Sequence, residues 1–336
     1  MSMEQYKTQK ADRPDLSDLE VAQPLGYIGG KIFPTATVYQ KSGTINYQGL
    51  EADSAAQTDR ALGAAPASNV VAEATTSFTC GERIKRYIVD WTRVASYGGI
   101  EASDKLGAKS AKRSVLNSLE TAQIAALIDD VGTDISSNIV EGIIAGAYSV
   151  RRYTGKLAFV CNQGTYRWMI QQTAFKNLML RSMGGLSAEE AMSFSPAVFK
   201  ATLQGLFRFD EVLIGDDSYW PGTLTYTAAI CKIPDGVDTE SYLIEPEIGR
   251  TLVYLPSDDT AEQFTISSNP DENLRSNVYD AMVWDSVKQF NSGAKYLVRI
   301  GNVDDESSSS SESEGNNSSS SSLDSSSSST SSSSSS

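Results

Sequence analysis

Few residues of this chain have the types and spacing that catalysis requires. Ser292 and Lys295 have the spacing of a serine nucleophile and its lysine base, but the companion Lys-Thr-Gly motif is missing. The acidic residues Asp129, Asp130 and Asp134 lie around a glycine but lack the twelve-residue ligand pattern of a calcium loop. Neither group therefore predicts a reaction or a metal site.

Other common site chemistries are also missing. Gly29, Gly30 and Lys31 lack the spacing and the hydroxyl residue of a phosphate-binding loop. The 336 residues include no histidine, which excludes Ser-His-Asp and Cys-His mechanisms and His-ligated metals. The chain has three widely spaced cysteines, which we interpret as buried, reduced thiols of a cytosolic protein: Cys80, Cys161 and Cys231. We expect no catalytic residues, no metal site and no cofactor.

The charge balance limits the partners. Lysine and arginine number 28 against 42 acidic residues, a formal charge of −14. A general nucleic-acid binder needs a dominant basic face, so this balance argues against one. An acidic surface is still compatible with packaged DNA that does not adhere to it. No apolar run is long enough for a signal peptide or a bilayer span, and we expect no membrane partner.

The first half of the chain predicts two strands and a long helix. Residues 32–47 and 70–96 are rich in β-branched and aromatic residues, and the soft stretch 48–69 separates them. Two strands joined by such a stretch predict a protruding hairpin. A structureless loop of this length is uncommon in a compact domain unless it has a role. Residues 103–130 carry the clearest helical period, with Val115 and Leu119 on one stripe.

The charges of this helix oppose its dipole. Basic side chains gather toward its N-terminal end: Lys105, Lys109, Lys112 and Arg113. Asp129 and Asp130 stand at its C-terminal end, where the macrodipole also disfavours them. Either the helix is solvated and tolerates a small penalty, or another subunit supplies complementary charge. On the second interpretation the four basic residues are candidate inter-subunit contacts.

The second half predicts an α+β domain with mixed sheets. Helices are expected near 135–150, across 162–180 and at 195–205. Strands are expected at 157–161, 206–216 and 223–232, with several more in 242–303. The serine-rich residues 304–336 have almost nothing to bury and should be disordered.

The order of these segments resembles that of the major capsid proteins of tailed bacteriophages, which share the Hong Kong 97-like shell fold. Three stretches carry the resemblance: IGGKIFPTATVYQKSGTINY (28–47), LAFVCNQGTYRWM (157–169) and FKATLQGLFRFDEVLIGDDSYW (199–220). Each stretch is loose by itself, and the specificity comes from their order over roughly residues 20–303.

The resemblance implies an α+β fold made of several parts. They are an N-terminal arm (1–37), an extended β-hairpin loop (38–100), a peripheral domain with the spine helix (101–156), an axial domain (157–238), strands that complete both domains (239–303) and a disordered tail (304–336).

The resemblance also implies a structural role without catalysis. The chain would assemble with itself into the hexamers and pentamers of an icosahedral shell around double-stranded DNA. Such a shell forms in the host cytoplasm and becomes the virion capsid, with portal and decoration proteins as further partners. No large domain precedes the arm, which implies a separate scaffolding protein or unaided assembly. No lysine lies between Ser42 and Glu82, so we expect no isopeptide cross-links between subunits.

Two alternatives stay open from the sequence. The same fold could form the shell of a cellular nanocompartment around an enzyme. A secreted binding module with a serine-rich stalk is the rival from another class, although the signal peptide and the prolines typical of such stalks are missing. An enzyme ranks third, since no catalytic motif supports it.

Overall fold

The computed structural model describes a defined part of the chain. The described residues are 11–12, 26–49, 73–129, 133–134, 138–182, 196–221, 227–235, 247–255, 264–271 and 273–299. The predicted disorder of 304–336 and the soft tip of the hairpin lie outside these residues, as does most of the predicted arm. None of the described helices is long and apolar enough to cross a membrane.

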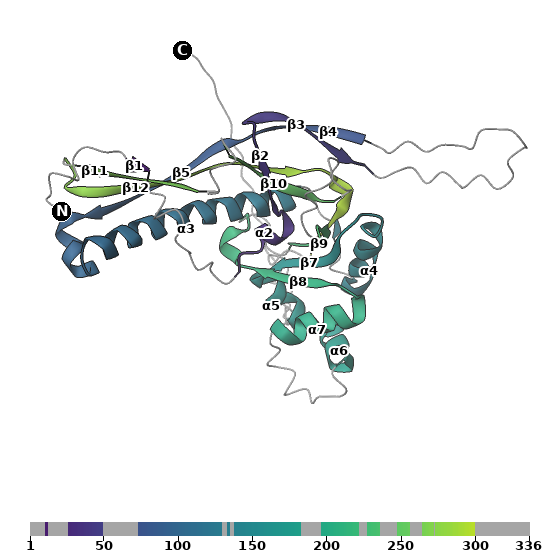
Figure 1. Cartoon of the computed structure of the whole chain (residues 1–336). Helices are drawn as coiled ribbons and strands as arrows, with labels where there is room; N and C mark the ends of the chain where they lie inside the picture. The colour runs from purple at the N-terminus through teal and green to yellow at the C-terminus, as the bar shows by residue number, and fades with distance from the viewer. Residues whose placement is uncertain are drawn as a thin grey trace, which may run out of the picture. The chain divides into compact units, whose positions relative to one another are not determined.

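A long helix runs along a six-stranded sheet (Figure 1). The helix is α3 (Ile100–Leu127), and its buried stripe includes Ala108, Ala111 and Val115. The strands of this sheet are β1 (Ala11–Asp12), β11 (Thr265–Asp271), β12 (Ser276–Gln289), β10 (Gly249–Tyr254) and β2 (Thr35–Val38) in that order, with β5 (Gly81–Asp90) also pairing with β12. Alternate residues of β12 turn toward α3, which is the period-2 burial expected of a sheet covered on one face.

A second sheet of five strands has a core on each face. Its order is β6 (Thr133–Asp134), β13 (Lys295–Arg299), β9 (Thr227–Ile233), β7 (Lys156–Asn162) and β8 (Glu211–Gly215). Phe159 and Cys161 of β7 face one core, whereas Ala158 and Val160 face the other. Because both faces are covered, β7 and β9 are almost continuously buried, as strands buried on both faces should be.

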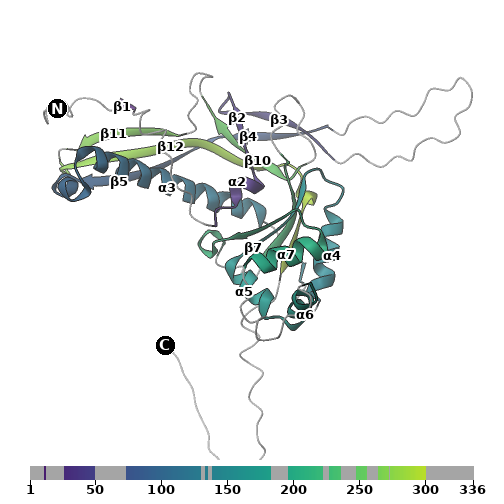
Figure 2. The same ribbon diagram turned by 60° about the horizontal axis from the view of Figure 1, so that its bottom comes forward.

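Four helices pack on one face of this second sheet (Figure 2). They are α4 (Ile139–Ser149), α5 (Gln163–Gln171), α6 (Thr173–Ser182) and α7 (Pro196–Phe207). Aromatic rings of Phe159, Phe175 and Phe199 meet in the core beneath them, with centroid separations from Phe199 of 6.3 and 5.4 Å. On the other face lie the C-terminal end of α3 and the short helix α2 (Gly29–Ile32).

The third sheet is a two-stranded hairpin, β3 (Ser42–Gln48) with β4 (Glu73–Thr79). It confirms antiparallel pairing between the two strand-prone runs. The second run divides at Cys80, because β5 leaves the hairpin and pairs with β12. Both strands of the hairpin are largely exposed on alternate residues, so little of it is buried within this chain.

Most predicted elements occur where the sequence placed them, with shifted ends. The long helix begins at Ile100 and not at Ser103, and α4 begins at Ile139 and not near 135. The stretch 162–180 forms two helices, because Gln172 adopts an extended backbone between α5 and α6.

Two strand predictions were wrong at their ends, and so was the predicted extended arm where it enters its strand. Residues 91–96 form a 3₁₀ helix, which spans Trp91–Tyr97 and which the side chain of Asp90 caps through the N–H of Thr92. Residues 206 and 207 belong to α7, so β8 is shorter than predicted. Residues 29–32 form α2 where an extended arm was expected to enter its strand. Local propensity favoured extension at each place, and capping or burial decided otherwise.

Candidate subunit-contact surfaces

The root of the arm is held by a carboxylate from α3. Ile28 and Gly29 donate their backbone N–H groups to Glu120 at 2.8–3.0 Å. The first residues of α2 have no side-chain cap of their own, so Glu120 supplies the acceptor that the helix start lacks. Burial raises the pKa of Glu120, and the two N–H bonds oppose that rise.

A second polar chain fixes the entry into β2. Gln123 donates to the hydroxyl of Thr251 at 2.8 Å, and that hydroxyl donates to the carbonyl of Phe33 at 3.0 Å. All three residues are buried. These bonds join α3, strand β10 and the residues just before β2 at one point. They therefore fix the direction in which the chain enters β2 and then the hairpin.

The hairpin is anchored by one aromatic contact at its base and by a second near the other end of its described strands. The ammonium of Lys41 lies 3.6 Å from the ring centre of Trp284, and Tyr47 stacks on Phe290 at 5.4 Å. The N–H of Cys80 donates to the carbonyl of Lys41 at 2.8 Å, which closes the hairpin where β5 begins. The hairpin is thus fixed near both ends of its described strands, while these strands offer polar edges and side chains to solvent.

The face of the six-stranded sheet that turns away from α3 is partly apolar. Ile84 and Ile88 of β5 are about half exposed, and the exposed pair Arg86–Asp280 lies between them. Arg83, on the opposite face, binds Asp285 bidentately at 2.8 and 2.9 Å and also donates to Ser118 of α3. One face is therefore bound to the spine helix, and the other is left available.

The four predicted contact residues all lie on α3 but differ in their surroundings. Lys105 pairs with Glu101 one turn earlier at 2.6 Å, and both are well exposed. Lys112 lies over the ring of Phe264 at 5.1 Å and is half-buried. Lys109 and Arg113 are exposed. Lys105, Lys109 and Arg113 follow one another at four-residue spacing, so they share one exposed face of the helix.

The dipole argument for these residues changes with the observed helix start. Since α3 begins at Ile100, its first turn contains the favourable Glu101, and the four basic residues lie beyond that turn, where the dipole effect has declined. At the other end Lys295 pairs with Asp129, so this chain itself supplies one complementary charge. Asp130 lies outside the described residues. The inter-subunit role of the four residues stays a prediction.

The weak catalytic motifs have structural surroundings. Lys295 is nearly buried and donates to Gln289 and to the carbonyl of Ala126, besides its pair with Asp129. Those bonds occupy the ammonium group of Lys295 and link β13 to α3. They give Lys295 a structural role and not that of a base for Ser292. The N–H of Gly29 donates to Glu120, so a carboxylate already occupies the position that a phosphate would take.

Cysteine and metal chemistry find no site among the described residues. No three metal-ligating side chains of those residues come together. Cys80, Cys161 and Cys231 are buried free thiols, and burial raises the pKa of Cys231 to about 12. The same desolvation raises the pKa of Cys161, so neither thiol ionises readily. The prediction of buried thiols is confirmed.

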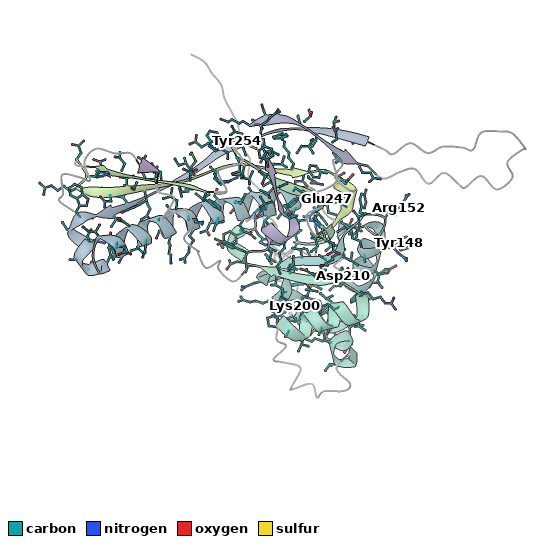
Figure 3. All side chains as sticks on the ribbon, in the orientation of Figure 1. Tyr148, Arg152, Lys200, Asp210, Glu247 and Tyr254 are labelled. Carbon is teal, nitrogen blue, oxygen red and sulfur yellow. The ribbon has the colours of Figure 1, made fainter. Side chains whose placement is uncertain are left out.

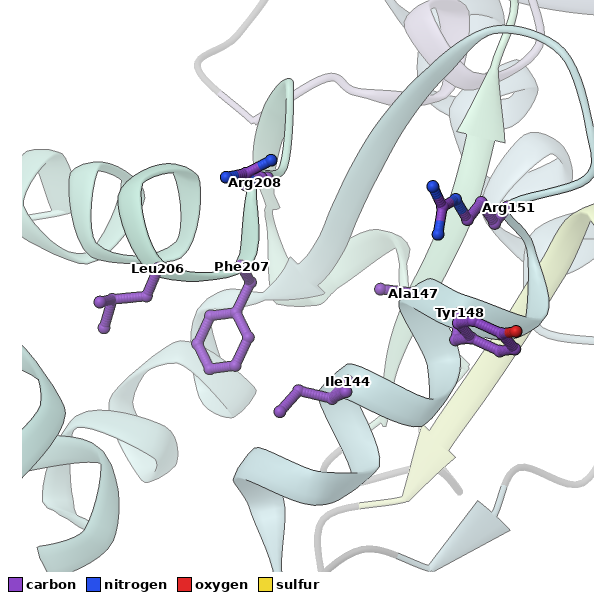
Figure 4. A pocket seen from close by; sticks show the side chains of 7 residues that line it. All are labelled: Ile144, Ala147, Tyr148, Arg151, Leu206, Phe207 and Arg208. Carbon is purple, nitrogen blue, oxygen red and sulfur yellow. The ribbon is translucent and has the colours of Figure 1, made fainter.

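A groove between α4 and α7 is the surface that sequence reasoning missed. Seven residues line it: Ile144, Ala147, Tyr148, Arg151, Leu206, Phe207 and Arg208 (Figure 4). Its volume is about 320 Å³. Tyr148 and Arg152 lie on the outer side of α4 and the turn that follows it (Figure 3). The sequence feature that could have indicated this groove is the apolar stripe of α4. The stripe is wider than the buried face of the helix, since Ile143 is buried while Ile144 and Tyr148 are exposed.

Comparisons by sequence find no relative. No protein-family model matches this sequence, and no curated protein sequence matches it.

Solved structures do match over nearly the whole chain. A phage-related protein from Bordetella bronchiseptica RB50 aligns over 87% of this chain and 98% of its own, with a TM-score of 0.59 and 15% identity. The capsid of cyanophage P-SCSP1u covers 85% of this chain and 91% of its own, with a TM-score of 0.53 and 9% identity.

The mature capsid of bacteriophage PhiM1 aligns over 85% of this chain and 90% of its own, with a TM-score of 0.51 and 12% identity. At such identities the likeness is one of fold. The expected fold is confirmed: an α+β chain with a long spine helix along a mixed sheet, a hairpin and a second sheet covered by helices. This chain has the Hong Kong 97-like shell fold of the capsid proteins of tailed bacteriophages.

Proposed function

We propose that this chain is the major capsid subunit of a tailed-phage-like particle, and that it assembles into hexamers and pentamers of an icosahedral shell around double-stranded DNA. The carrying observation is the fold likeness to the capsids of cyanophage P-SCSP1u and bacteriophage PhiM1, which extends over most of each chain. The role is structural, and the subunit acts in the virion capsid after assembly in the host cytoplasm.

The exposed hairpin supports this function. Ordering a residue of backbone costs about 1–2 kcal/mol, and β3 and β4 recover little of it within one chain because few of their side chains are buried. Contacts with neighbouring subunits offset that cost in a shell. Contacts with neighbouring subunits also cover the apolar side chains of Ile84 and Ile88, which are exposed on the face of the sheet that turns away from α3.

The segment roles are part of the proposal. Residues 1–37 act as the arm, 38–100 as the extended loop over a neighbour, 101–156 with the spine helix as the peripheral domain and 157–238 as the axial domain, while 239–303 complete both. A portal and decoration proteins are the further partners, and assembly proceeds either with a separate scaffolding protein or unaided. Lys105, Lys109 and Arg113 on the exposed face of α3, together with the half-buried Lys112, contact another subunit.

The acidic character of the chain suits a container for DNA. With a net charge of −14, a wall of many copies repels the phosphate backbone, and packaged DNA meets no strong non-specific binder. In this role the chain encloses packaged DNA without sequence-specific binding.

Electron microscopy of the purified full-length protein, alone and with its scaffold partner, tests the function. Uniform closed shells, hexamers or curved sheets are the expected result. A monodisperse monomer under both conditions would contradict it. Shells that copurify with a single enzyme and without DNA would favour the nanocompartment, and a secreted monomer would favour the binding module.

A further inference from the structure

Three of the exposed large apolar side chains gather at one place on the second sheet's helical layer. Ile144 is 55% exposed, Tyr148 is 74% exposed and Leu206 is 45% exposed, and all three line the groove between the C-terminal ends of α4 and α7 (Figure 4). Such side chains scattered singly would need no explanation, but a cluster around a hollow marks an interaction surface.

The rim of this groove is basic. Arg151 and Arg208 line it, and none of the described residues in its lining is acidic. Arg208 adopts a left-handed backbone, with φ of 57°, which is uncommon for a residue other than glycine. Strained backbone of this kind is concentrated at functional sites, and here it turns the arginine at the end of α7.

The position of α4 is fixed by tight packing, so its exposed residues are presented on a rigid element. A Cβ on Gly146 would overlap Ile230 and Tyr296, which shows how closely the helix approaches the sheet. Ile143 and Ile139 are buried in the core beneath. Ile144 and Tyr148, on the opposite face, cannot turn inward without moving the whole helix.

The lining has the chemistry of a protein–protein contact. Tyrosine and arginine are the residue types enriched at interface hot spots, and the apolar floor of Ile144, Leu206 and Phe207 provides the area that such anchors need. A small ligand would be poorly enclosed, since the tyrosine at the rim is mostly exposed to solvent.

Charge identifies the occupant. In a chain of net charge −14, a groove lined by two arginines has the sign opposite to that of the rest of the molecule. A second copy carries the same net negative charge, so its acidic side chains are attracted to this groove. The serine-rich end of the chain carries acids such as Asp304 and Asp305, but almost no apolar side chains to fill the floor.

We propose that the α4–α7 groove receives an acidic, partly apolar stretch of a second copy of this chain, and so forms a lateral contact between neighbouring subunits. The inference rests on the proposed shell function and names one of the surfaces through which the subunits associate. Arg151 and Arg208 pair with carboxylates of the second copy, while its apolar side chains cover Ile144 and Tyr148.

Photo-cross-linking from the groove tests the occupant. Benzoylphenylalanine replaces Tyr148 in the full-length protein, and assemblies are made from equal parts of ¹⁴N-labelled and ¹⁵N-labelled chains. The expected product is a covalent dimer whose linked peptides carry both labels, with Asp or Glu close to the linked position. Exclusively single-label peptides would show that the groove is covered within one chain and would overturn the proposal, as would cross-links only to a different protein.

Matched variants test the energetics. Arg151→Glu/Arg208→Glu should lower the yield of assembled particles about thirtyfold, which corresponds to the loss of one hot spot. The control Arg151→Lys/Arg208→Lys keeps the charge and should assemble far better, and Tyr148→Phe should assemble better than Tyr148→Ser. Circular dichroism of each unassembled subunit verifies that the exposed substitutions leave the fold intact.

The outcomes separate this inference from the function on which it rests. If the unaltered chain forms no assembly at all, the shell function fails. If it forms shells and the folded charge-reversed variant forms them with unchanged yield, the function stands and the groove is not a subunit contact.

Discussion

The carboxylate of Glu120, in the C-terminal third of α3, accepts the backbone N–H of Gly29 at 2.9 and 3.0 Å, across 91 residues of sequence. A side chain of the spine helix thus completes the first turn of a different helix, α2. Because Ile28 donates to the same carboxylate, this one residue satisfies two buried backbone donors at the root of the arm.

Removing that carboxylate should destabilise the subunit strongly. Glu120→Ala leaves the N–H groups of Ile28 and Gly29 buried without an acceptor, and each such group costs about 1–3 kcal/mol. We expect urea denaturation of the unassembled subunit to show a loss of about 2–4 kcal/mol. Glu120→Gln keeps one acceptor oxygen and should lose clearly less. Equal losses for the two variants would contradict the capping role.

The buried carboxylate also makes stability depend on pH in a definite direction. Burial raises the pKa of Glu120 above its ordinary value of 4.5, so the folded state holds this proton more tightly than the unfolded state. Its contribution to stability is therefore fully present below about pH 4.5 and is lost as the pH rises through the raised pKa.

Denaturation of wild type and Glu120→Gln across a pH series measures this effect. The wild type should gain stability relative to the variant as the pH falls from 7. A relative loss over the same range would mean that the two N–H bonds outweigh burial and lower the pKa of Glu120.

The close packing of α3 on the sheet at Tyr279 depends on a glycine. A Cβ added at Gly107 would lie inside the van der Waals radius of the buried Tyr279 ring. Gly107→Ala should therefore cost about 1–3 kcal/mol through overpacking, measured by the same denaturation. Gly205→Ala, in α7, is the matched control, because a Cβ there meets nothing within 4 Å and should be neutral or slightly stabilising. Similar losses at both positions would refute the packing argument.

Two bidentate arginine–aspartate pairs on β5 and β12 should differ greatly in importance. Arg83 pairs with Asp285, whose side chain is 1% exposed, whereas Arg86 pairs with Asp280 and is 63% exposed. Arg83→Met leaves a buried carboxylate without its partner and should cost about 3 kcal/mol. Arg86→Met should cost much less, since water replaces the lost contact. Comparable unfolding midpoints for the two variants would contradict this ranking.

The long-range contacts explain why some features could be predicted from sequence and others could not. The period of α3 and the β-rich runs are local signals, and they predicted the spine helix, the hairpin and the α+β class. The division at Cys80 is not local: residues on both sides favour strands, and only the pairing of β5 with β12, about 200 residues later, separates them.

The candidate surfaces show the same limit. Lys105, Lys109 and Arg113 were identified from their charge and their four-residue spacing. Residues at this spacing share one face of a helix, so the sequence alone was enough to group them. The groove joins α4 to α7, whose contributions lie about 60 residues apart, so no sequence window contains both halves. Ile144 and Tyr148 could be recognised as surplus apolar residues only once the buried face of α4 was known.

Truncation after Val303 should leave shell assembly intact. The last described strand, β13, ends at Arg299, and its described pairing with β9 and β6 involves no residue beyond that position. The stretch 304–336 contains a single large apolar residue, Leu323, and can add little to a core. It also holds six acidic residues, so its removal changes the formal charge from −14 to −8 (28 against 36).

We expect electron microscopy to show shells of unchanged size from the truncated chain. A full-length variant with the six acids replaced by serine serves as the control for charge. Truncated chains that stop at free capsomers, while the serine control closes normally, would mean that the tail itself is needed for assembly.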